Sequence, residues 1–208
     1  MIVEQPARIF RWLYPHALWR MDHGKREVYL TFDDGPIPEA TPFILDALDS
    51  MGIKATFFMV ADNALRYPQL FQEVCSRGHR IGNHTFHHVH GFMCGSLRYI
   101  CDVQDAEKVL NSGKLFRPPC GWITPGICTR LNAEGWRIVM WDVVTRDYSN
   151  MLSPDQVLEN VKNILTVEKV NLACIPKDNG AEAWCYEIKA VCKNKTFLIY
   201  VNTKTGHE

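Results

Sequence analysis

Residues 30–39 read LTFDDGPIPE, an apolar run that ends in two adjacent carboxylates and is then turned by Gly35-Pro36. The apolar residues from Val28 onward are typical of a buried strand, and neighbouring residues of a strand point to opposite faces. Two adjacent carboxylates repel each other when both are ionised. The stretch therefore raises the question of whether Asp33 and Asp34 perform different tasks.

Downstream of this strand, the sequence alternates between strand and helix patterns. Apolar strands are predicted at 55–60, 79–84, 115–119 and 137–144, and amphipathic helices at 41–52, 67–78, 96–110, 124–135 and 153–165. Thr41 and Ser153 are the expected N-caps of their helices. Five β-α units in a row predict an α/β fold, a parallel sheet with helices outside, either open or closed into a barrel.

The rhythm changes after Leu165, where the helical period disappears. Three strands are predicted instead, at Asn171–Ile175, Ala183–Cys192 and Thr196–Asn202, which form a short antiparallel meander. The predicted division is an N-terminal extension at 1–27, an α/β domain at 28–166 and a β-rich tail at 167–208.

The composition narrows the classes of partner. The 208 residues carry a formal net charge of zero, which gives a nucleic acid no global electrostatic support. No segment is long or apolar enough for a transmembrane helix or a signal peptide, so a cytoplasmic monomer is the default expectation. The eight cysteines form no CxxC pair. We expect them to be mostly reduced, with a disulfide framework as the alternative.

Polar residues gather where the predicted strands end, and the carboxyl ends of parallel strands lie at one edge of a sheet. His84 and His88 would share a face if the chain became helical there, and a carboxylate from the Asp33-Asp34 pair would complete an open metal site. The other carboxylate could serve as general base, held ionised by Arg117. Each feature alone also has an ordinary interpretation: incidental histidines, a turn, and a structural salt bridge.

Taken in order, the segments TFDDGP, HTFHH, RPPCG and WDVVTRDY resemble the polysaccharide deacetylases of the NodB-homology type, carbohydrate esterase family 4. The resemblance runs from about Val28 to Leu165. It implies a distorted (β/α) barrel, here incomplete, and a metal-dependent hydrolase. Its substrate would be an acetylated, mainly N-acetylated, sugar polymer or oligosaccharide such as peptidoglycan or chitooligosaccharide.

The resemblance also implies roles for individual residues. Asp33 would be the general base, paired with Arg117, and the backbone N–H of Cys120 would contribute to the oxyanion hole. The metal, zinc by default with cobalt, nickel or manganese as alternatives, would be bound by Asp34, His84 and His88. His87 and His90 are expected to be bystanders. The remaining residues, expected at the substrate, are Thr85, Pro119, Gly121, Trp122, Asp147 and Tyr148.

Two departures from the family pattern stand out. The fourth motif has Val144 where an aspartate is usual, and Asp142 is a possible substitute. The family's closing Leu-x-His, whose histidine acts as general acid, is absent, and the tail's one histidine is His207. The tail resembles a PepSY-type module, or else is a divergent end of the barrel. Impaired catalysis is therefore expected, with a non-catalytic carbohydrate- or metal-binding remnant as the alternative. An unstable hybrid chain and hydrolysis of a cyclic imide are lesser ones.

Overall fold

A computed structural model describes residues 8–20, 29–141, 144–145, 151–153, 155–157, 167–176, 182–192 and 195–202. Its main feature is a five-stranded parallel sheet in the order β1-β2-β3-β4-β5. The strands are β1 (Thr31–Asp33), β2 (Thr56–Met59), β3 (Arg80–Asn83), β4 (Leu115–Phe116) and β5 (Arg137–Ile138). The predicted strands are thus confirmed, with shorter bounds.

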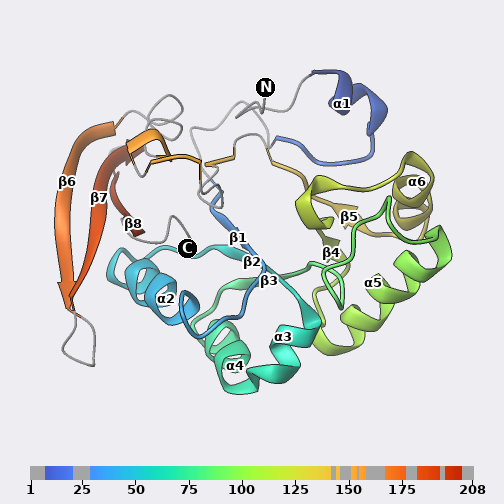
Figure 1. The fold of residues 1–208 in the computed structure, drawn as a ribbon, viewed down its shortest axis with the longest axis horizontal. Helices are drawn as coiled ribbons and strands as arrows, with labels where there is room; N and C mark the ends of the chain where they lie inside the picture. Colours follow the sequence, from blue (N-terminus) through green and yellow to red (C-terminus); the bar gives the residue numbers. More distant parts are fainter. Residues whose placement is uncertain are drawn as a thin grey trace.

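The strand order matches the chain order, so the sheet has no point at which its winding reverses. Right-handed crossovers in that arrangement place the helices on one side, as in a (β/α) barrel. Figure 1 shows these helices around the outside of the sheet. They are α2 (Thr41–Ser50), α3 (Ala61–Arg66), α4 (Pro68–Ser76), α5 (Ser96–Leu110) and α6 (Pro125–Ala133). The five described strands form an arc, not a closed barrel.

Two apolar clusters fix the helices to the sheet. Leu45, Phe57 and Met59 belong to the first, which lies under α2 and β2. Tyr99, Phe116 and Ile138 belong to the second, which joins α5, β4 and β5. All of these side chains are at most 2% exposed, so the strand ends are held by a dry core.

The N-terminal segment packs beside β5, at one edge of this sheet. It begins with α1 (Arg8–Leu13), and Leu18 then forms a parallel bridge with Val139 just beyond β5. The Tyr14 hydroxyl donates to the carbonyl of Ile123 at 2.6 Å. Leu18 thus extends the sheet beyond β5 by a single bridge. No helix among the described residues combines the length and apolarity that a bilayer crossing requires.

The tail forms a second sheet, drawn in orange and red in Figure 1. Its strands are β6 (Val167–Pro176), β7 (Glu182–Cys192) and β8 (Lys195–Asn202), paired antiparallel in the order β6-β7-β8. The predicted meander is confirmed, and β6 begins four residues earlier than expected.

Several local predictions can be compared with the structure. Ser153 behaves as a cap, because its Oγ accepts from the Gln156 amide at 3.3 Å. Thr41 does not, because it is the first residue of α2 and its hydroxyl accepts from the Ile37 amide at 2.9 Å. The short helix α3 was not predicted. The cysteines whose side chains are described are all free, namely Cys75, Cys94, Cys101, Cys120 and Cys128.

Candidate active site

The two adjacent acids lie in different backbone conformations. Asp33 is the last residue of β1, whereas Asp34 has a φ of 69° and has left the strand. This left-handed conformation is uncommon for a residue other than glycine. Asn63 supports it by donating from Nδ2 to the Asp34 carbonyl at 2.8 Å. The change of conformation lets the two carboxylates face different partners.

His84 follows β3 and is almost fully buried. Its Nδ1 lies 2.8 Å from the Arg117 carbonyl, and its Nε2 lies 3.3 Å from Asp34 Oδ1. A carbonyl only accepts hydrogen bonds, so Nδ1 carries a proton and Nε2 of the neutral ring presents a lone pair. Such a lone pair and a carboxylate oxygen repel each other unless a proton or a metal ion lies between them.

His88 reaches the same carboxylate from an irregular loop. Its Nε2 lies 3.0 Å from Asp34 Oδ1, and both Thr85 and His88 have positive φ values, 68° and 53°. The helix considered for residues 84–88 is therefore wrong. The reason is that other groups take the loop's amides: Asn83 Oδ1 accepts from Thr85, and Asp102 accepts from Phe86 and His87.

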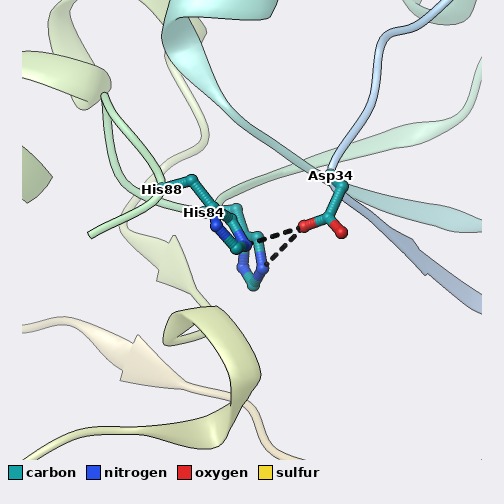
Figure 2. A group of neighbouring side chains, drawn as sticks. All are labelled: Asp34, His84 and His88. Atoms are coloured by element: carbon teal, nitrogen blue, oxygen red, sulfur yellow. Dashed lines mark ion pairs between the residues drawn. The ribbon is translucent and has the colours of Figure 1, made fainter. Parts of the chain in front are cut away.

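Figure 2 shows Asp34, His84 and His88 converging on one point. Their ligand atoms all lie within 4.8 Å of one another. Partial desolvation would raise the pKa of the Asp34 carboxyl, but where a proton lies between each ring and this carboxylate, hydrogen bonds from His84 and His88 outweigh that effect and lower the pKa well below its ordinary value. The bond to Asp34 raises the pKa of His88 in turn.

This donor set fits a divalent metal ion. Two imidazole nitrogens and one carboxylate are a common three-ligand set for zinc, and a fourth position stays open for water or substrate. Ligands bound tetrahedrally at 2.0–2.2 Å are roughly 3.3–3.6 Å apart. The nitrogen–oxygen distances of 3.0 and 3.3 Å are close to that spacing. The same ligands also accept cobalt, nickel or manganese.

Arg117, which follows β4, holds the other carboxylate. Its Nη1 donates to Asp33 Oδ1 at 2.8 Å and to Thr31 Oγ1 at 2.6 Å, and Nη2 donates to the Met140 carbonyl at 2.9 Å. Its guanidinium carbon lies 4.1 Å from the centre of the Phe58 ring. Burial lowers the pKa of this guanidinium while Asp33 opposes that shift. Arg117 thereby fixes the orientation of Asp33.

The other residues expected at the site have varied positions. Thr85 is fully buried, and its hydroxyl accepts from the Val89 amide at 3.2 Å, so it supports the loop. Pro119, Cys120 and Gly121 form a 3-10 turn (η1, Pro119–Gly121) in which Cys120 has a φ of 52°. Trp122 is 53% exposed and contacts Phe92 edge to face. Val144 is described, but Asp142, Asp147 and Tyr148 lie outside the described residues.

A cavity of about 390 Å³ opens beside the cluster. It is lined by Asp34, Val60, Asp62, Asn63, His87 and His88.

Two residues that support the site, Asn63 and Asp102, were not predicted from the sequence. A signal existed for Asp102, which lies three residues after Tyr99 and four before Ala106 on the buried side of α5, where an acid needs partners.

The sequence and the fold are similar to those of known proteins. The family model described as "Polysaccharide deacetylase" matches residues 20–139. A peptidoglycan-N-acetylglucosamine deacetylase of Bacillus cereus is 35% identical over 158 residues, which are 73% of this chain and 57% of that protein. A chitooligosaccharide deacetylase of Sinorhizobium fredii is 36% identical over 65% of this chain and 66% of its own length.

A solved structure shares the fold. It is a crystal structure of a peptidoglycan N-acetylglucosamine deacetylase bound to an N-hydroxybenzamide compound. Its TM-score is 0.69 at 34% identity, and the match covers 74% of each chain. The present chain therefore spans somewhat more than half of the Bacillus cereus relative and about three quarters of the solved chain. A family match over more than half of the sequence shows that the chain belongs to the polysaccharide deacetylase family.

Proposed function

We propose that this protein is a metal-dependent deacetylase that hydrolyses N-acetyl groups of a sugar chain such as chitooligosaccharide or peptidoglycan. One observation carries the proposal: two consecutive carboxylates are separated into two environments. Asp34 lies between two imidazoles, while Asp33 is held by a buried arginine. That division supplies a metal ligand and a separate base, as hydrolysis of an amide requires. The deacetylases among its relatives support the substrate class.

In this proposal, Asp34, His84 and His88 hold the metal, with zinc as the expected ion. A bound divalent metal would polarise the acetyl carbonyl and acidify a water molecule. Asp33 accepts the proton of the attacking water, and Arg117 orients its carboxylate. The Arg117 carbonyl also fixes the ring of His84 through Nδ1, so the ligand and the base share one support.

The acyl oxygen and the sugar chain need further contacts. We assign the backbone N–H of Cys120 to the developing oxyanion, a role that a backbone donor retains whatever its side chain. Pro119, Gly121 and the exposed Trp122 would contact the sugar chain, and Asp147 and Tyr148 are proposed as further substrate contacts. Thr85 would act through the loop that carries His88.

The C-terminal tail affects the rate of deacetylation that we expect. We propose that residues 167–208 are a separate PepSY-like unit that supplies no general acid, so that only residues 28–166 carry the chemistry. General acid catalysis contributes about 10²–10⁴-fold. Slow but measurable turnover is therefore expected, since attack by water and stabilisation of the oxyanion do not depend on the missing histidine.

The test is acetate release from N-acetylated chitooligosaccharide and from peptidoglycan fragments by the zinc-loaded protein. An Asp33→Asn variant is the matched control, because it keeps the shape of the side chain and leaves the three ligands in place. The wild type should release acetate at least about 100-fold faster than this variant. Equal rates would remove Asp33 from the mechanism. Zinc binding without acetate release from either protein would instead indicate a non-catalytic carbohydrate or metal binder.

A further inference from the structure

His87 is an exposed side chain that is nevertheless held in place. Its ring is 64% exposed, yet Nδ1 lies 2.5 Å from Asp102 Oδ1, and its ring centre lies 4.6 Å from that of Phe86. The side chain of Asp102 is only 11% exposed. The same carboxylate also accepts the amides of Phe86 at 2.8 Å and His87 at 3.1 Å. The backbone and the ring of His87 are thus both held by one largely buried carboxylate.

This contact decides which nitrogen of His87 is available. An ionised carboxylate only accepts hydrogen bonds, so the proton lies on Nδ1, between the ring and Asp102. Nε2 of the neutral ring is then left as an acceptor on the exposed edge. A ring whose tautomer and orientation are already fixed loses little conformational entropy when a partner binds.

His87 lies at the cavity beside the candidate metal site. His87 lines the cavity that also contains Asp34 and His88 of the metal cluster. Asp62, on α3, adds a second carboxylate to the wall. None of the described residues that line the cavity is a lysine or an arginine. Carboxylate and imidazole acceptors on four of the six lining residues suit a neutral ligand that carries hydroxyl donors. The cavity volume lies within the range of about 300–1,000 Å³ seen for small-molecule sites.

We propose that His87 is a specificity-determining residue: its Nε2 accepts a hydrogen bond from a hydroxyl of a neutral sugar chain beside the metal cluster, and Asp102 positions it. The inference rests on the proposed function and identifies a contact that selects its substrate. His87 is therefore not a bystander.

The experiment compares steady-state acetate release from N-acetylated chitooligosaccharide by five zinc-loaded proteins, the wild type and four variants. In His87→Phe, the ring packing on Phe86 is kept and the acceptor is lost, so KM should rise about 2–10-fold with kcat within about twofold. His87→Gln keeps an acceptor and should recover most of the wild-type KM. His16→Phe, at an exposed histidine outside the cavity lining, is the matched control and should leave both constants unchanged.

Asp102→Asn keeps an oxygen for the two amides but no longer fixes the proton on Nδ1, so its KM should rise by no more than that of His87→Phe. Metal content, measured for each variant, shows whether His88 is disturbed. An unchanged KM in His87→Phe at full metal content would overturn the proposal, as would a loss confined to kcat.

If the wild type releases no acetate, the proposed function fails, and His87 is judged by binding alone. Titration calorimetry with the same oligosaccharide should then show a Kd that is weaker in His87→Phe by a similar factor. Equal Kd values, or no binding to the wild type, would overturn the proposal.

Discussion

The parallel sheet and the C-terminal meander differ in what their hydrogen bonds connect. In the parallel sheet, β3 lies beside β4, which is more than thirty residues further along the chain. In the meander, each strand pairs with its immediate neighbour in sequence. Only the sheet gathers distant residues, so that Asp33 meets Arg117 across 84 positions. The chemistry of this chain therefore depends on non-local pairing, which the meander does not supply.

Removing a metal ligand should have the largest effect on the site that the parallel sheet builds. His84→Ala deletes a buried ligand together with its bond to the Arg117 carbonyl. We expect zinc affinity to fall by at least about 100-fold, because loss of even a supporting partner typically costs about 10–100-fold. Competition with a chelator measures the change. His90→Ala is the control, and an equal loss in both variants would contradict the assignment of His84.

The second-largest effect is expected for Arg117, which links β4 to residues of β1 and to residues just beyond β5. Arg117→Lys keeps the charge, but a lysine cannot bond to Asp33, Thr31 and two backbone carbonyls at once. Breaking a buried ion pair typically lowers the free energy of unfolding by about 3–5 kcal/mol. Because lysine keeps the positive charge, we expect a smaller loss of about 2–3 kcal/mol. Chemical denaturation measures it. The rate of acetate release should fall as well, with zinc affinity less affected.

Much of this sheet was predictable from sequence because its elements follow local periodicity. The strands leading to Asp33 and His84, and the helix at Ser96–Leu110, follow from apolar patterns. The loop that carries His88 could not be predicted in the same way. Its left-handed residues are maintained by Asn83, a local contact two residues before Thr85, and by Asp102 on α5, a contact between elements. A four-residue spacing of histidines suits a helix equally well, and tertiary hydrogen bonds decided against it.

Asn63 shows the same limit on sequence reasoning. It lies on α3, a six-residue helix too short for a clear period, and it stabilises the conformation that separates the two acids. The convergence of Asp34, His84 and His88 was predictable because all follow strand ends. Their supporting contacts were not, since these join positions with no sequence relation.

A smaller loss of stability is expected at Gly82, which packs against the Phe58 ring next to Arg117. A Cβ added at Gly82 would lie 2.4 Å from Phe58 Cδ1, and Phe58 stacks against the guanidinium. Gly82→Ala should therefore shift that ring and lower the free energy of unfolding by about 1–3 kcal/mol. Denaturation with urea measures the loss. Gly126→Ala, in α6 with nothing within 4 Å of an added Cβ, is the control and should not destabilise the protein.

The smallest effect should come from deleting the meander. Both apolar clusters consist of residues between 14 and 141, and all three candidate metal ligands precede Arg117. Among the described strands, β6, β7 and β8 pair only with one another. A chain ending at residue 166 therefore keeps both apolar clusters, the parallel sheet and the candidate metal ligands. We expect its zinc affinity to stay within about twofold of the full chain and its thermal unfolding to remain cooperative. Calorimetry and chelator competition measure both. A broad transition or aggregation of the shortened chain would show that the meander covers an open edge of the sheet, and the separation of the two regions would then be wrong.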